Sequence, residues 1–187
     1  MAPNPNIKIN SKSKSNQFFE YPESIVRHIS CDTHYLQMDI RSYEPRDRAS
    51  CIGIFESLTP ELLHSAAMPH FEAWLNRPAS AYLVMEHEGS IVGCGGYSFS
   101  PDGTAAILHW GMIQRGSHKL GLGRYLLLYR IREIGRKGTA GMVFAHSPRP
   151  SAAFFEKQGF RASAIGKDAY APGIDSVVLT KKLTVCP

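Results

Sequence analysis

A glycine-containing turn between an apolar run and an amphipathic run constrains the fold of this chain more than any other feature. Residues 105–113 are apolar and strand-like, and the residues after the turn place apolar side chains at helical spacing. Between the two runs, Gly121 and Gly123 let the backbone approach a ligand and leave the first amide groups of the helix unblocked. These N–H groups lie at the positive end of the helix dipole, where a phosphate binds well. The sequence therefore predicts a phosphate-binding turn, with Lys119 and Arg124 adding positive charge beside it.

The turn does not match the two best-known glycine-rich phosphate motifs. A dinucleotide-binding fingerprint requires a third glycine where this chain has Leu126, and an acidic residue about 20 residues further on. A P-loop requires Lys-Ser or Lys-Thr directly after its last glycine, where this chain has Arg124 and Tyr125. A glycine turn that only permits close helix packing stays open as an alternative on the local sequence.

A second segment narrows the alternatives. Residues 151–160 read Ser-Ala-Ala-Phe-Phe-Glu-Lys-Gln-Gly-Phe, which predicts a short helix ended by glycine before a strand. Together with residues 118–123, this segment resembles the GNAT superfamily of acetyl-CoA-dependent N-acetyltransferases. The family's pyrophosphate motif, Gln/Arg-x-x-Gly-x-Gly/Ala, and its later signature, Asn-x-x-Ala-x-x-Phe-Tyr-Glu-Lys-x-Gly-Phe, are matched here in the same order. The resemblance covers about residues 40–183.

Length and composition are those of one globular domain. With 187 residues, 43% of them hydrophobic, the chain can bury a full-sized core. No apolar run approaches the ~20 residues that span a bilayer, and we see no secretory signal. The four cysteines are scattered, so we expect a cytoplasmic protein with reduced thiols and no membrane partner. The eight histidines show no paired spacing on a helix, and we expect no metal.

The net charge of +5 suits an anionic ligand such as CoA and is too low to require nucleic acid. Residues 1–37 are rich in Asn, Ser and Lys and are predicted to form an N-terminal extension, flexible or packed on a domain of residues 38–187. A less favoured possibility makes Lys8, Lys12 and Lys14 part of a basic arm that contacts RNA.

Hydrophobic periodicity predicts the order of the elements along the domain. We expect strands at about 39–43, 81–86, 90–100, 105–113, 140–145, 161–166 and 176–183, and helices at about 47–58, 60–75, 123–136 and 150–158. This order predicts an α/β fold, a mixed sheet of about seven strands flanked by about four helices. It is also the order of the GNAT fold.

The resemblance implies a set of CoA-binding residues. The acetyl carbonyl would lie at the end of the fourth predicted strand, at Gly111, Met112 and Ile113. The pyrophosphate would rest on the turn formed by His118, Lys119, Leu120, Gly121, Leu122, Gly123 and Arg124. Ser147, Ser151 and Phe154 complete the set.

Two positions depart from the family pattern and leave the proton donor open. Phe155 stands where many members use a tyrosine as general acid toward the CoA sulfur, and Pro148 replaces the usual asparagine. Ser147 and Ser151 are the nearest replacement hydroxyls, although helix capping is the favoured role for them. Tyr170, near the following turn, could supply the acid or line the acceptor pocket.

His109 is the candidate general base, because an ordinary histidine pKa of about 6.5 suits proton acceptance near neutrality. On a regular strand it would share a face with Ile107 and Gly111 and oppose Leu108 and Trp110. A structural role is the alternative for this histidine.

The resulting functional hypothesis is an enzyme that transfers acetyl from acetyl-CoA to a primary amine directly, within a ternary complex. The acceptor would be a small molecule or a peptide amine, and exposed strand edges make a homodimer possible. The alternative is a non-catalytic acyl-CoA-binding sensor or recruitment module, suggested by the missing tyrosine and asparagine.

Overall fold

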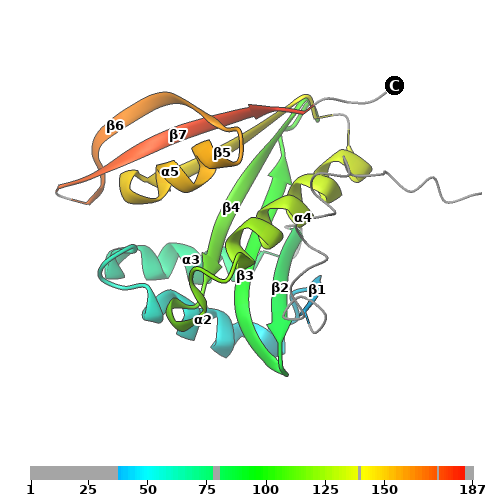
Figure 1. The fold of residues 1–187 in the computed structure, drawn as a ribbon, viewed down its shortest axis with the longest axis vertical. Helices are drawn as coiled ribbons and strands as arrows, with labels where there is room; N and C mark the ends of the chain where they lie inside the picture. The colour runs from blue at the N-terminus through cyan, green and yellow to red at the C-terminus, as the bar shows by residue number, and fades with distance from the viewer. Residues whose placement is uncertain (1–37, 78–80, 139, 172, 184–187) are drawn as a thin grey trace, which may run out of the picture. The chain divides into compact units, whose positions relative to one another are not determined.

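The computed structural model describes residues 38–77, 81–138, 140–171 and 173–183, and these form a seven-stranded mixed sheet with helices on both faces (Figure 1). The strands follow the order β1-β2-β3-β4-β5-β7-β6 across the sheet. Every neighbouring pair is antiparallel except β4 and β5, which run parallel. The strands are β1 (Met38–Ser42), β2 (Ala81–His87), β3 (Ser90–Phe99), β4 (Ala105–Ile113), β5 (Met142–Pro148), β6 (Arg161–Ala171) and β7 (Ile174–Lys182).

Four α-helices accompany the sheet in the described residues, which confirms the predicted α/β fold. They are α2 (Arg48–Ser57), α3 (Met68–Leu75), α4 (Leu122–Lys137) and α5 (Arg149–Lys157). Short 3-10 turns precede three of them, at Pro45–Asp47, Ser65–Ala67 and Arg115–Ser117. The predicted extension of residues 1–37 and its lysines lie outside the described residues, so the domain boundary stays a prediction.

The sheet separates two hydrophobic clusters. On one face, Leu122, Leu126, Leu127 and Ile134 of α4 join Ala152 of α5 and apolar residues of six strands. On the other face, Phe55 of α2 and Phe71 of α3 stack with their ring centroids 5.6 Å apart. These apolar residues recur every three to four positions, which is why the helices could be predicted from the sequence.

The second predicted helix begins later than expected. The apolar spacing suggested a start near residue 60, but the residues from 60 to 64 form turns and α3 begins at Met68. Pro69 explains the difference, because it lacks an N–H and is compatible only with the first turn of a helix. Strand β5 also runs three residues beyond its predicted end, to Pro148, and this extension forms a wall of the site.

Two further properties concern the described residues only. No described helix has the length and apolarity needed to cross a membrane. Among the same residues, no group of three or more histidine, cysteine or acidic side chains could hold a metal ion.

Candidate functional site

The central feature of the site is a gap between the two parallel strands. Strands β4 and β5 pair only from Ala105 to Leu108, opposite Met142 to Ala145. Beyond this point β5 stays paired with β7 as far as Pro148, whereas β4 continues to Ile113 along β3. Backbone groups on the facing edges of β4 and β5 are thereby left without a strand partner.

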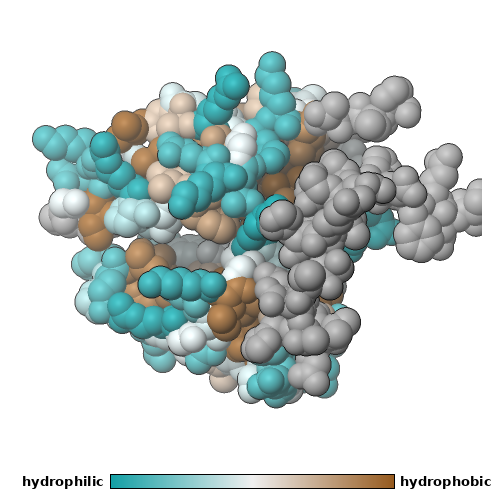
Figure 2. Space-filling view, viewed as in Figure 1, coloured by the Kyte–Doolittle hydropathy of each residue, from teal (hydrophilic) through white to brown (hydrophobic). Residues whose placement is uncertain are grey.

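A cavity of about 1000 Å³ lies at this gap. Its walls come from β4, β5, the start of α4, α5 and the segment after α2. Figure 2 shows the surface hollowed between the part built on β5–β7 and the part built on α2 and α3, with apolar side chains among the polar ones at its rim.

Strand β4 contains a bulge where it borders the cavity. Trp110 has a φ of 44°, which is rare for an aromatic residue, and the β3–β4 register shifts between Cys94 and Gly96. The hydroxyl of Tyr82 donates to the Trp110 carbonyl at 3.1 Å and helps to hold this conformation. The bulge directs the following residue, Gly111, toward α4 and the cavity.

The bulge overturns the predicted alternation of side chains. His109 stacks on Trp74 of α3, with ring centroids 4.0 Å apart, and Trp110 packs on Phe71, also of α3. Both side chains therefore lie on the α2/α3 face, although on a regular strand they would oppose each other. The extra residue in the bulge accounts for this.

The glycine turn has the geometry expected of an anion-binding helix start. Gly121 precedes α4 with a φ of 78°, a left-handed conformation that glycine adopts without strain. No side chain caps the helix, and the first intrahelical bond runs from the Tyr125 N–H to the Gly121 carbonyl. The N–H groups of Leu122, Gly123 and Arg124 consequently have no partner within the helix. All three residues line the cavity.

His118 shapes this turn through a bond to β4. Its Nε2 lies 2.8 Å from the carbonyl oxygen of Ile113, and because a carbonyl only accepts, the ring must donate there. The ring therefore ties the turn to the strand beside the cavity. Arg124 donates from Nε to Gln158 at 3.2 Å, which connects the start of α4 to the end of α5.

The structure brings nearly all of the predicted CoA-binding residues together. The cavity is lined by Gly111, Met112, Ile113, His118, Lys119, Gly121, Leu122, Gly123, Arg124, Ser147, Ser151 and Phe154. Leu120 is in the turn but is not part of the lining, and its side chain is half exposed. The lining suits acetyl-CoA, because unpaired N–H groups and positive side chains gather at one end of a largely apolar cavity.

His109 also lines the cavity, but its environment weakens it as a base. Its Nε2 lies 2.9 Å from Ser98 Oγ, and burial, followed by electrostatic interactions with Arg77, His146 and Arg130, lowers its pKa to about 4. The imidazole is therefore neutral at pH 7 and able to accept a proton, although with low basicity. Its catalytic role stays a prediction.

The candidate proton donors are placed as follows. The Phe155 ring lines the cavity and packs edge-on against Phe160, with ring centroids 5.4 Å apart. An apolar ring therefore occupies the position at which a tyrosine hydroxyl would have been the proton donor. Helix α5 begins at Arg149 with Pro148 before it and no side-chain cap, so the expected capping by Ser147 or Ser151 is wrong.

Ser147 is buried, and its hydroxyl donates to the Pro148 carbonyl at 3.2 Å rather than to a helix N–H. The backbone of Tyr170 belongs to β6, and its side chain is outside the part of the chain that the structure describes. The role predicted for Tyr170 stays a prediction.

Sequence reasoning missed Arg130, a cavity residue on α4 that is only 3% exposed. It occupies a position of the apolar stripe, four residues after Leu126 and four before Ile134. An arginine at that spacing was a detectable signal, because charged residues are seldom fully buried without a partner. Other lining residues that were not predicted include His146, Ser117, Gln158 and three leucines at or after the end of α2, Leu58, Leu62 and Leu63.

Comparison with known proteins supports the same assignment. The family described as "Acetyltransferase (GNAT) family" matches residues 49–160. No curated protein sequence matches the chain.

Among solved structures, a GNAT-family protein of Desulfovibrio desulfuricans is 21% identical with a TM-score of 0.66, covering 79% of this chain and 99% of its own. The ribosomal-protein-S18-alanine N-acetyltransferase of Escherichia coli is 16% identical with a TM-score of 0.65, covering 80% and 96%. The yncA protein of Salmonella typhimurium, solved with acetyl-CoA, is 20% identical with a TM-score of 0.63, covering 80% and 96%. At these identities the likeness establishes the fold.

Proposed function

Because the chain belongs to the GNAT family of acetyltransferases, we propose that it transfers the acetyl group of acetyl-CoA to the nitrogen of a primary amine. The observation that carries this proposal is the uncapped start of α4, opening into the cavity where β4 and β5 separate. The N–H groups of Leu122, Gly123 and Arg124 would hold the diphosphate of CoA, with the helix dipole and Lys119 adding attraction.

The unpaired edge of β4 would then hold the rest of the donor. Beyond Leu108, backbone groups of β4 face the cavity instead of β5, and they suit the amide groups of an extended arm. Gly111 leaves the strand accessible at the bulge, where a backbone N–H would stabilise negative charge developing on the thioester oxygen. The amine would have to be neutral when it attacks.

Direct transfer in a ternary complex is favoured over a covalent acyl-enzyme. No cysteine is among the described lining residues, and Cys51 and Cys94 are buried in the core on the α2/α3 face. With a pKa of about 4, His109 is a weak acceptor for the proton that the attacking amine must lose. The departing thiolate would leave without help from a tyrosine, because Phe155 has no hydroxyl.

The test is amine-dependent release of CoA. The purified full chain is incubated with acetyl-CoA and a panel of primary amines, and free thiol is measured together with the mass of the acylated product. We expect thiol release only with an amine, and intersecting lines in double-reciprocal plots. Tight binding of acetyl-CoA without turnover of any amine in the panel would instead identify a non-catalytic acyl-CoA sensor.

Location and assembly stay predictions. A cytoplasmic, metal-independent enzyme acting on a small molecule or a peptide amine, without nucleic acid or membrane partners, agrees with the composition. In the described sheet β1 and β6 form the two edges, and Ile165 of β6 is 58% exposed, so a homodimer through this edge is a reasonable expectation.

A further inference from the structure

Arg130 is a buried cation without an anionic partner in the described residues. Its side chain belongs to the inner face of α4, and the residue is only 3% exposed. Nε donates to the Leu126 carbonyl and Nη1 to the Gly96 carbonyl, both at the long distance of 3.4 Å. A guanidinium has five N–H groups, so three remain without an acceptor among these residues.

Two glycines make room for this guanidinium at the β4 bulge. A Cβ on Gly111 would lie 2.6 Å from Nη2 and 2.9 Å from Nη1, and a Cβ on Gly95 would lie 2.9 Å from Nη1. Any larger residue at either position would therefore displace the charged group. The guanidinium lies against the part of β4 that we assign to acyl transfer, and Arg130 is part of the cavity wall.

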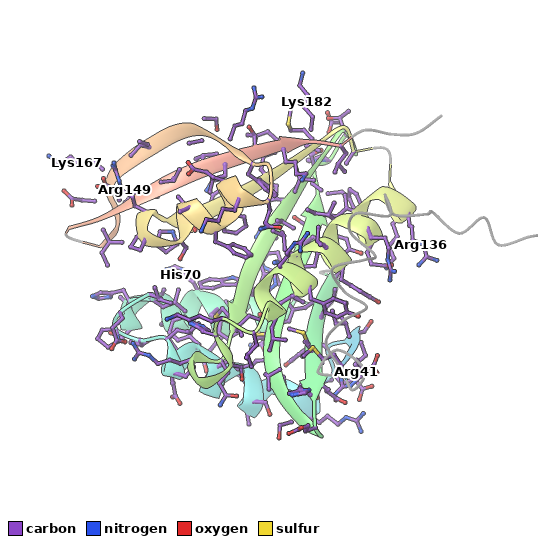
Figure 3. All side chains as sticks on the ribbon, in the orientation of Figure 1. Arg41, His70, Arg136, Arg149, Lys167 and Lys182 are labelled. Atoms are coloured by element: carbon purple, nitrogen blue, oxygen red, sulfur yellow. The ribbon has the colours of Figure 1, made fainter. Side chains whose placement is uncertain are left out.

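The other charged residues of the cavity lining offer no anionic partner for Arg130. The described residues that line the cavity include Lys119, Arg124 and Arg130 and contain no aspartate or glutamate. Figure 3 shows Arg149 on the β5–β7 side, where it pairs with Asp175, an acid that is not part of this cavity lining. A cavity of this kind is poorly suited to polycationic amines, which require carboxylates to bind.

The diphosphate of CoA does not account for Arg130. The Arg130 Cα follows Leu122 by eight positions, about 12 Å along the axis at 1.5 Å per residue. The guanidinium reaches back to the Leu126 carbonyl and lies beside Gly111 of β4, not at the helix start. Burial lowers its pKa to about 10, so the side chain is still charged at neutral pH. The anion that pairs with it must therefore come from the reacting end of a ligand.

We propose that Arg130 binds a carboxylate at the point of acyl transfer. This inference rests on the proposed function and specifies its substrate class. The carboxylate belongs either to the acceptor, an amine that carries a carboxyl group close to its amino group, or to the donor, an acyl chain that ends in a carboxyl group. In both cases the planar guanidinium offers two parallel N–H groups to two carboxylate oxygens.

Matched substrates separate the two sources. The full chain is assayed with acetyl-CoA and each of the twenty amino acids, and again with the corresponding amino-acid amides, which keep the amine and lose the negative charge. Malonyl-CoA and succinyl-CoA are compared with acetyl-CoA using the same amides. We expect a preference of roughly 30-fold or more in kcat/KM for the carboxylate, in the acceptor series or in the donor series.

Arg130→Met should reduce that preference to within about threefold, and Arg130→Lys should restore part of it. Arg132→Met is the matched control, because Arg132 is an exposed arginine on the same helix, 4.9 Å from the ring of Tyr129. This control should keep the full preference. Equal kcat/KM for acids and amides with acetyl-CoA, combined with no gain from malonyl-CoA or succinyl-CoA, would overturn the role of Arg130 while leaving acetyl transfer intact. An Arg130→Met variant that keeps the preference would do the same.

A binding measurement covers the case in which no substrate pair is turned over. With CoA present, N-acetyl amino acids and their amides, and separately succinate, are titrated while the Tm of the protein is recorded. We expect a carboxylate-specific rise in Tm that Arg130→Met abolishes and Arg132→Met retains. Equal responses to the charged and amide forms, or no response to any of these probes, would reject the carboxylate site.

Discussion

If Arg130 is kept for a ligand, replacing it should stabilise the ligand-free protein. Arg130→Met removes the charge and retains most of the volume of a long unbranched side chain. A residue with a purely structural role would behave in the opposite way, because breaking its bonds would destabilise the fold. The sign of the stability change therefore distinguishes the two explanations without any substrate.

The magnitude follows from the two contributions that the substitution removes. Burial lowers the pKa of Arg130 from 12.5 to about 10, a difference that corresponds to roughly 3 kcal/mol of unfavourable burial of the charged form. Its two hydrogen bonds, at 3.4 Å each, offset this by roughly 0.5–1 kcal/mol apiece. The net expectation is roughly 1–2 kcal/mol of added stability for Arg130→Met.

The pH dependence of this penalty has a definite sign. A base whose pKa is lower in the folded state destabilises the fold at every pH below the folded value, because both states are then charged. The penalty is therefore fully present below about pH 10 and decreases as the pH rises through that value. The difference between wild type and Arg130→Met should accordingly be constant across the neutral range.

The assay is urea denaturation of the full chain without ligands, supported by thermal melts. A gain of roughly 1–2 kcal/mol corresponds to a rise of several degrees in Tm, at roughly 2–4 °C per kcal/mol for a domain of this size. Arg132→Met, whose side chain is exposed, should stay within about 0.5 kcal/mol of wild type. A loss of more than about 1 kcal/mol in Arg130→Met would refute the view that the buried charge is a net burden on the ligand-free fold.

Further predictions concern the phosphate turn, the catalytic candidates and the core. Gly121→Asp places a negatively charged side chain at a φ of 78° in the turn before α4. Calorimetry should show CoA binding weakened by more than ~1.4 kcal/mol, or tenfold. The control Gly135→Asp, at an open position of the same helix, should leave CoA binding unchanged. His109→Ala should leave the pH profile of kcat/KM unchanged between roughly pH 6 and 9, because a pKa of about 4 keeps the wild-type ring neutral there. If the substitution removed an ionisation near pH 7 from the kcat/KM profile, this prediction would be contradicted. Phe155→Tyr should raise kcat without changing CoA affinity, by restoring a proton donor to the cavity wall, and an unchanged kcat would show that thiolate departure needs no donor. Asp47→Asn should lower the free energy of unfolding at pH 7 by roughly 3 kcal/mol, since Asp47 is buried and ion-paired with Arg41, with Oδ2 2.7 Å from Nη1.

The Asp47 prediction carries a pH window that follows from its environment. Hydrogen bonds from Arg41, together with the Glu44 N–H at 2.8 Å, hold the pKa of the Asp47 carboxyl below its ordinary value despite burial. A lowered carboxyl pKa contributes stability above the unfolded pKa of about 4, and this contribution is lost as the pH falls through the folded value. The difference between wild type and Asp47→Asn in urea denaturation should therefore shrink below about pH 4, and a difference independent of pH would contradict the ion-pair explanation.

Most of the fold could be predicted because its signals are local. The apolar runs, the turn residues between them and the helical spacing of Leu126, Leu127 and Ile134 each depend on neighbouring residues only. The glycine turn before α4 was predictable for the same reason, since a left-handed glycine before a helix is a short-range requirement, while phosphate binding there stays a prediction. The start of α3 was predicted wrongly because apolar spacing outweighed the constraint imposed by Pro69.

The chemistry of the cavity could not be predicted in the same way because it depends on long-range register. One extra residue at Trp110 turns His109 and Trp110 to the same face, and nothing in the local sequence specifies that bulge. The low pKa of His109 arises from packing against α3, a helix more than thirty residues away in sequence. Arg130 was overlooked because an arginine in an amphipathic helix is usually on the solvent side.

Several features that are unfavourable for stability occur together where β4 and β5 separate. Trp110 holds a φ that aromatic residues rarely adopt, Gly95 and Gly111 weaken two strand interiors, and Arg130 is buried without a counter-charge in the described residues. Each would be replaced readily if stability alone determined the sequence, because an ordinary strand with an apolar helix face would pack better. The guanidinium is the nearest group to a Cβ at both glycines, and at Gly95 the backbone of Gly111 is also close, which links the two glycines and Arg130 as one arrangement. Since this arrangement lies against the cavity at the proposed point of acyl transfer, a ligand that neutralises the arginine explains why these unfavourable features are found together.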